Sequence, residues 1–419
     1  MARITYGANN LGFWNPAGEY QNWYDVTRLD MSFLVLEFNP AKAGFSYDPN
    51  EQPYKIVFSF RDAEITVPTE GPRAGDDVFT DGTIANVRMF NDSGQLIWRA
   101  AGLNSDLSYF MNKWDDGGTW DAFQSIMSAP FTIVGANGNG RPPGDWTGDD
   151  IDTGYQRDIV NALQGDDFIK DYGGRDIYRG GGGWDTVSYE QWYYSPGHVD
   201  RGLNVNLTTG TIRGPDRNVD QVVGVEAVRG TFRKDIFVGN NADNGFMGFD
   251  GRDFFNGRGG SDWVAYDRDD RYGGFQGIFA NLRRDFVTDG FNDRDVVMNI
   301  ENVVGTNFDD VFLDTTGDNE FRGHDGEDVF YFKQGSDIAR GGNGDDTFIY
   351  QTARFGDDLI EDFEVGSDVI RVGGAATFGD LDLSQDGSDT IVAWNGNTIR
   401  LWNVDHTDLD AEDFGYVIV

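Results

Sequence analysis

Aspartate and asparagine recur every nine positions in three stretches of this 419-residue chain. Their side chains offer oxygen ligands, whereas the chain has no cysteine and only three histidines. Such a ligand set selects a hard cation, Ca²⁺, over Zn²⁺. The candidate metal-binding side chains are Asp158, Asp167, Asp176, Asp185, Asp235, Asn244, Asp253, Asp262, Asp310, Asn319, Asp328, Asp337 and Asp346.

Glycines keep the same nine-residue step, most of them two residues before the aspartate. Because glycine tolerates positive φ, a turn built from it can direct backbone carbonyls toward one centre. An apolar residue follows almost every aspartate at the second position, as at Val160 and Phe312, and predicts a short strand that points into a core. The glycines expected to form metal-binding turns are Gly165, Gly174, Gly181, Gly183, Gly251, Gly260, Gly317, Gly326, Gly335, Gly342 and Gly344.

One turn and one strand make half a coil, so turns on the same side of the structure are expected eighteen residues apart. Stacking them places two carboxylates and several carbonyls around one ion. Some turns depart from the pattern, since Asn244 and Asn319 lack the charge and Arg258 replaces a glycine. We therefore expect several calcium ions, but fewer than one per repeat.

Residues 341–349 match the nonapeptide GGxGxDxUx, in which U is a large apolar residue. The pattern resembles the known calcium-binding repeat of RTX (repeat-in-toxin) proteins. This resemblance implies an all-β fold whose main body is a parallel β-roll over residues 150–356. The arrays would occupy 150–188, 230–265 and 305–350. Between them, β inserts at 189–229 and 266–304 are expected to leave the roll as two or three strands and re-enter it.

The charge is concentrated in the repeat region. Of the formal net charge of −38, −30 lies in residues 149–419, which contain 53 acidic and 23 basic residues. Without cations such a region repels itself, so we expect metal binding and folding to be coupled. The same charge argues against nucleic acid as a partner.

Residues 357–419 resemble the segment that follows the repeats in secreted RTX proteins. It includes a hairpin signal at Asn395-Gly396 and ends with the acidic and then apolar residues 413–419. The resemblance implies a C-terminal signal read by the type I secretion machinery of Gram-negative bacteria, and hence a secreted or cell-surface protein. Alternatively, residues 416–419 form a last core strand. Neither an apolar signal-peptide core near the N-terminus nor a transmembrane run is present in the sequence.

Residues 1–135 contain no nonapeptide and are rich in aromatic residues. Alternating apolar runs predict strands at 32–38, 54–60, 64–67, 84–90 and 95–99, with a hairpin turn at 91–94. Helices are expected to begin near Asn104 or Ser105 and at Thr119. We expect a small β-sandwich or jelly-roll-like domain with short helices, followed by a linker at 136–149.

The sequence contains none of the common catalytic signatures, HExxH, GxSxG, GxxxxGK or a cysteine nucleophile. We therefore expect no catalytic residues and predict a calcium-folded structural or adhesive protein at the cell surface, in an extracellular matrix or in an ordered assembly. The alternative is a polysaccharide-active enzyme or carbohydrate-binding protein whose site lies in residues 1–135. In the first insert Trp192, Tyr193 and Tyr194 cannot all face one core, so we expect at least one of them to face a partner or a neighbouring subunit. For the protein as a whole we expect self-assembly or contact with a cell surface or a glycan.

Overall fold

The computed structural model describes the backbone of the strands between residues 13 and 134 and, beyond them, residues 150–153, 156–190, 201–351 and 354–417. Two compact units divide the chain, one of residues 1–188 with 216–225 and the other of residues 189–215 with 226–419. In the part that is described, no helix is long and apolar enough to cross a membrane.

The first unit begins with antiparallel strands. A small sheet pairs β1 with β2, and a meander joins each later strand to the next in chain order up to β8. The bounds are β1 Phe13–Trp14, β2 Tyr20–Gln21, β3 Tyr24–Leu29, β4 Phe33–Phe38, β5 Lys55–Thr66, β6 Val78–Phe90, β7 Leu96–Asp106 and β8 Thr132–Val134.

The predicted strands overlap β4 to β7, whereas β1, β2, β3 and β8 were not predicted. There are two further differences. The runs expected at 54–60 and 64–67 form one long strand, β5. The helix expected near Asn104 does not begin there, because Ser105 and Asp106 extend β7 by pairing with Ile84 and Thr83 of β6. The rest of that helix, the helix from Thr119 and the linker at 136–149 lie outside the described residues.

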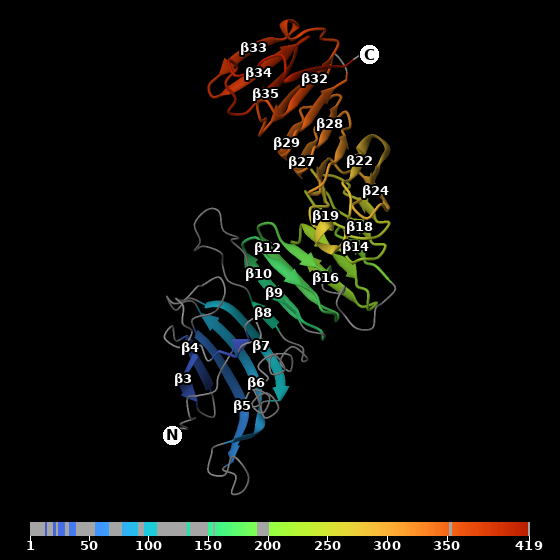
Figure 1. Ribbon diagram of the computed structural model, residues 1–419. Coiled ribbons are helices and arrows are strands. Elements are labelled where there is room, and N and C mark those ends of the chain that lie inside the picture. The colour runs from blue at the N-terminus through green and yellow to red at the C-terminus, as the bar shows by residue number, and fades with distance from the viewer. Residues whose placement is uncertain are drawn as a thin grey trace. The chain divides into compact units, whose positions relative to one another are not determined.

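The meander leads into parallel strands of the same unit. In one sheet β10 lies between β8 and β12, and β12 also pairs with β16; in the other, β11 lies between β9 and β13 (Figure 1). Successive strands thus alternate between two sheets, as in a coil. The bounds are β9 Asp150–Asp152, β10 Ile159–Gln164, β11 Phe168–Lys170, β12 Ile177–Gly182, β13 Thr186–Ser188 and β16 Val219–Val223.

The second unit also contains a parallel β-roll. One sheet contains β18, β20, β24, β26, β28 and β30, and the other β17, β19, β21, β25, β27 and β29. The bounds are β17 Ala227–Arg229, β18 Ile236–Val238, β19 Gly245–Met247, β20 Phe254–Asn256, β21 Trp263–Ala265, β24 Arg294–Met298, β25 Asn302–Val304, β26 Val311–Leu313, β27 Glu320–Asp325, β28 Val329–Phe332, β29 Ile338–Asn343 and β30 Thr347–Tyr350.

The register confirms the eighteen-residue coil. Phe312 pairs with Phe330, which in turn pairs with Phe348. Their rings stack with centroids 4.9 and 5.1 Å apart, and all three side chains are fully buried. Burying each such ring contributes about 1.5–3 kcal/mol, so this ladder of apolar residues forms the core between the two sheets.

The described strands of the second insert do not leave the roll, contrary to the sequence-based expectation. In the second insert, β22 (Phe279–Asn281), β23 (Phe286–Thr288) and β24 form an antiparallel meander. Because β24 pairs with β20 and β22 pairs with β26, the three strands widen the existing sheet. This arrangement keeps the backbone groups of β20 and β26 hydrogen-bonded. Short 3₁₀ helices, η2 Asp269–Tyr272 and η3 Leu282–Arg284, flank β22.

The first insert is built similarly, since β14 (Asn204–Asn206) pairs antiparallel with β15 (Thr211–Arg213) and parallel with β18. Its Trp192, Tyr193 and Tyr194 lie outside the described residues, so the expectation that they contact a partner stays a prediction.

The C-terminal region closes the second unit. The antiparallel strands β33, β34 and β35 join the roll through the pairing of β35 with β31. Asn395 and Gly396 both have positive φ, as the predicted hairpin turn requires. Strand β36 pairs with β32, so residues 414–417 form a strand of the sheet. The bounds are β31 Asp357–Ile360, β32 Val369–Gly373, η4 Phe378–Asp380, β33 Asp382–Asp386, β34 Asp389–Trp394, β35 Asn397–Leu401 and β36 Phe414–Val417.

Candidate calcium sites

Backbone hydrogen bonds hold the aspartates in a ladder along the roll. The N–H of Asp310 donates to Oδ1 of Asp328 at 2.7 Å, and the N–H of Asp328 donates to Oδ1 of Asp346 at 2.9 Å. The same bond joins Asp235 to Asp253 at 2.8 Å. All the aspartates and asparagines singled out from the sequence are at most 3% exposed. The eighteen-residue repeat therefore brings successive carboxylates together and uses one oxygen of each.

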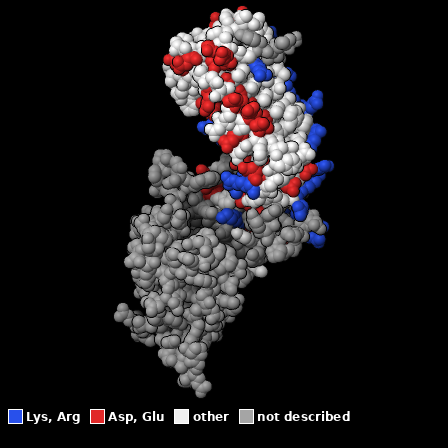
Figure 2. All heavy atoms as spheres, in the orientation of Figure 1, with Lys and Arg blue, Asp and Glu red and all other residues white. Residues whose placement is uncertain are grey.

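The second carboxylate oxygen is left without a hydrogen bond at several turns. These buried atoms are Oδ2 of Asp253, Asp262, Asp328, Asp337, Asp346 and Asp358. An ionised oxygen buried without a partner costs several kcal/mol unless a positive charge compensates it. Because every donor here is an oxygen, these turns fit a hard divalent cation such as Ca²⁺. Figure 2 shows acidic side chains gathered on one face of the second unit.

The electrostatics of the third array support this fit. Burial, followed by the charges of Asp310 and Asp346, raises the pKa of Asp328 to about 9. Burial likewise raises the pKa of Asp337 and of Asp346 to about 7, against the hydrogen bond that each accepts from a backbone N–H. Burial in the roll therefore disfavours the free ionised form of these carboxylates and favours binding of a proton or a cation.

This shift predicts the pH dependence of the calcium-free protein. The pKa of Asp337 and of Asp346 is raised from 3.8 to about 7 in the folded protein, so folding favours the protonated carboxyl groups. Their contribution to the free energy of unfolding is therefore fully present below about pH 4 and is lost as the pH rises through about 7. We expect calcium-free protein to melt cooperatively near pH 4 and to lose that folding transition as the pH is raised toward 8. A calcium-free Tm that rises with pH would contradict the burial of these groups.

The glycines have a steric role next to the carboxylates. A Cβ at Gly323 or Gly341, five residues before the aspartate, would lie 1.8 or 1.9 Å from Oδ2 of Asp328 or Asp346. At Gly344, φ is +136° and a Cβ would lie 1.9 Å from the carbonyl oxygen of Gly326 in the previous coil. Only glycine lets the turns stack this closely.

Two of the glycines predicted as turn residues differ from the others. Gly165, Gly174, Gly181, Gly183, Gly260, Gly326, Gly335, Gly342 and Gly344 have positive φ, whereas Gly251 and Gly317 do not. At the position of Gly342 in other repeats, Arg258 and His324 keep positive φ without being glycine. These substitutions therefore preserve the turn at a cost in backbone strain.

Several predicted ligands find partners within the chain instead. The amide of Asn319 donates to the carbonyl of Glu301, one coil earlier, at 2.7 Å. Asp310 accepts hydrogen bonds at Oδ1 from Ile278 and Thr306 and at Oδ2 from Thr306. The amide of Asn244 donates to Glu226 and Asp243, and Asp235 accepts from Leu203 and Thr231, in the same manner. At these side chains, hydrogen bonds within the chain replace part of what a cation would supply; the number of ions stays a prediction.

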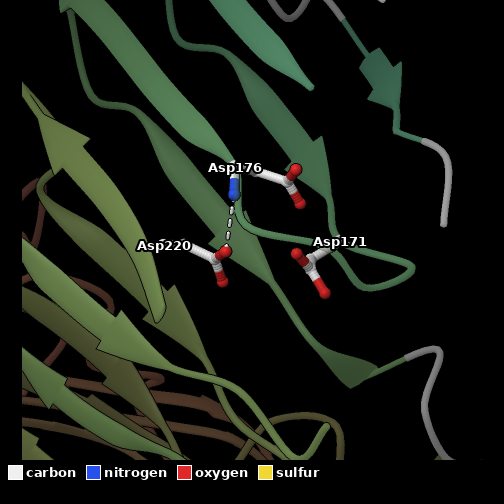
Figure 3. A group of neighbouring side chains, drawn as sticks. All are labelled: Asp171, Asp176 and Asp220. Carbon is white, nitrogen blue, oxygen red and sulfur yellow. Dashed lines mark hydrogen bonds between the residues drawn. The ribbon is translucent and has the colours of Figure 1, made fainter. Parts of the chain in front are cut away.

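The structure also adds carboxylates that the nine-residue spacing missed. Asp220 of β16 accepts the N–H of Asp176 at 2.8 Å (Figure 3). Asp171 stands where the repeat has its first glycine, and the three buried carboxylates lie within 4.8 Å of one another. The Tyr178 hydroxyl donates to Asp171 at 2.7 Å and to Asp176 at 3.1 Å. Burial and the two neighbouring charges raise the pKa of Asp176 to about 9.

Asp358 and Asp368 extend the ladder beyond the third array by accepting the N–H groups of Asp337 and Asp346 at 2.8 and 2.9 Å. Each stands two residues before a buried isoleucine, so the aspartate-x-apolar pattern identifies them once the fixed spacing is dropped. Asp220 shows the same pattern, with the buried Val222 two residues later, but only the strand register places it beside Asp176.

No protein-family model and no curated protein matches the chain. Similar solved structures include the extracellular lipase LipA from Serratia marcescens, 14% identical, with a TM-score of 0.19. The match covers 64% of this chain but only 38% of the lipase, so the chain spans well under half of that protein. Another is the AlgE6R3 subunit of a mannuronan C5-epimerase from Azotobacter vinelandii, 24% identical over 26% of this chain and 78% of its own, with a TM-score of 0.13. Neither likeness carries a functional argument at these values.

Proposed function

We propose that this protein is a secreted, calcium-binding RTX protein that folds on meeting calcium and has a structural or adhesive role outside the cell. The stacked, buried Oδ2 atoms without partners carry the proposal, because they fit cations at several turns of one roll. Calcium would be a folding cofactor here: it compensates the carboxylates and braces neighbouring coils, without taking part in a reaction.

The sites proposed to hold calcium are the turns in which a carboxylate oxygen faces glycine backbone. Asp262, Asp328, Asp337 and Asp346 supply such oxygens in the second and third arrays. Calcium sites of extracellular proteins have a Kd of roughly 10⁻⁴–10⁻³ M. Stacked turns with that affinity would bind calcium outside the cell and would hold none at the calcium concentration of the cytosol. This difference supports export as an unfolded chain through a type I secretion machinery.

A contact role is supported by apolar side chains on the outer face of the second insert. Phe279, Val296 and Met298 are 39, 39 and 38% exposed, and Phe275 before them is 65% exposed. Phe279 and Phe286 have ring centroids 5.8 Å apart across β22 and β23. Grouped exposed apolar residues of this kind are typical of surfaces that contact other molecules.

The test is the molar mass by light scattering while calcium is raised from a chelator into the millimolar range. We expect ordered growth above the monomer, and replacing Phe275 and Phe279 with serine should reduce that growth while leaving calcium-induced folding intact. A compact monomer throughout would reject the structural role and direct assays to glycans and residues 1–135. Absence of any response to calcium would reject the calcium sites themselves.

A further inference from the structure

The charged side chains along one sheet of the second unit are divided by sign. Its strands lie in the order β18, β20, β24, β23, β22, β26, β28 and β30. The residue directly before the buried aspartate at the start of the strand is basic on β18, β20 and β24 and acidic on β26, β28 and β30. These exposed residues are, in the same order, Lys234, Arg252 and Arg294, and then Asp309, Glu327 and Asp345.

The alternation of side chains along each strand places these charges on the outer face of the sheet. At β28 the buried residues are Asp328 and Phe330, so Glu327 points to the opposite, outer side. The other five strands show the same alternation, since each has a buried aspartate followed two residues later by a buried apolar residue. The charges also stack as the coils do, because the N–H of Glu327 donates to Oδ1 of Asp309 at 2.9 Å.

An apolar strip separates the basic half of this face from the acidic half. Phe279 of β22 and Val296 and Met298 of β24 are all more than a third exposed. On β23, the ring of Phe286 lies under the guanidinium of Arg294, 3.8 Å from its centroid. Apart from Arg294, no outward residue within the bounds of these eight strands is charged. An apolar centre with charged margins is the usual composition of a protein interface.

We propose that this outer face packs against the same face of a second copy of the chain, about a two-fold axis parallel to the strands between β22 and β23. Such a rotation lays β18 of one copy over β30 of its partner and keeps the starts of the strands together, as in two sheets packed face to face. The contacts that it predicts are Lys234 with the partner's Asp345, Arg252 with the partner's Glu327 and Arg294 with the partner's Asp309.

Charge complementarity is the reason for choosing a second copy. A uniformly acidic or basic partner would be attracted by one half of the face and repelled by the other. A second copy presents both charges in reverse order and at the same strand spacing, about 4.8 Å, and brings the two apolar strips together at the axis. The inference rests on the proposed structural role, for which it names the partner and the surface.

The test changes the sign of one half at a time in the full chain. K234E/R252E makes both halves acidic and E327K/D345K makes both basic, so each should weaken dimer formation in millimolar calcium by about tenfold or more. An equimolar mixture of the two variants should recover the association, because each half then meets its opposite. The control R322E/R340E changes the charge equally at exposed residues of β27 and β29, in the other sheet, and should associate like the wild type.

Sedimentation velocity over a range of protein concentrations gives the dissociation constants, and circular dichroism verifies that each variant folds in calcium. Variants that associate like the wild type, or a mixture that associates no better than its components, would overturn the proposed face and leave the structural role standing. A wild type that stays monomeric would reject both. If a double variant does not fold, Lys234→Glu and Asp345→Lys, single changes at exposed positions, repeat the comparison.

Discussion

Removing calcium at neutral pH should unfold the roll of this protein. Several buried Oδ2 atoms, among them those of Asp328 and Asp346, have no hydrogen-bond partner among the described residues, and the region that contains them has a net charge of −30. At millimolar free calcium and a Kd of roughly 10⁻⁴–10⁻³ M, each filled site adds about 0.4–1.4 kcal/mol, so several sites together are comparable with the lower part of the stability range of an ordinary domain, about 5–15 kcal/mol.

The measurement is the far-UV circular dichroism and the hydrodynamic radius during a titration from a chelator into calcium. We expect the strand signal to fall by more than half and the radius to increase without calcium, and both to recover on its addition. Magnesium at the same concentration controls for ionic strength and should restore little, because Mg²⁺ gives up its water reluctantly and demands regular geometry. A compact β structure in the chelator at pH 7.5 would contradict the coupling.

Replacing one turn glycine by alanine should be nearly as damaging. Gly341 has no positive φ, so its backbone suits alanine, yet the added Cβ would lie 1.9 Å from Oδ2 of Asp346. That aspartate is held by the N–H of Asp328 and cannot withdraw without breaking the ladder. We expect Gly341→Ala to lower the free energy of unfolding in calcium by about 3 kcal/mol and to weaken calcium binding.

Gly317→Ala in the same array is the matched control. Its Cβ would meet only Oγ1 of Thr315 at 3.7 Å, an ordinary contact. The expected change is within about 0.5 kcal/mol, measured by denaturant unfolding at fixed free calcium. If both variants lose the same free energy of unfolding, the close approach of Gly341 to Asp346 is not what requires glycine at this position.

The repeat spacing, together with the resemblance to RTX repeats, predicted the roll, its eighteen-residue coil and the stacking of carboxylates from successive coils. It succeeded because each coil contacts its neighbours almost exclusively, so local sequence and fold share one period. The pairing of Phe312 with Phe330 and Phe348 follows from that period. The hairpin at Asn395-Gly396 was equally local, since its turn depends on two residues that tolerate positive φ.

Only the tertiary structure decided where the period is interrupted. The sequence could not place Asp220 beside Asp176, or Asp269 beside Gly290, because contacts between residues more than twenty positions apart bring them together. Nor did it distinguish Asp310, whose oxygens accept bonds from Thr306, from Asp328, whose Oδ2 accepts none. The residue types and their spacing determined which oxygens line the roll. The contacts between coils and inserts decided which of those oxygens are free to bind a cation, since the hydrogen-bond donors that occupy the others come from residues distant in the chain.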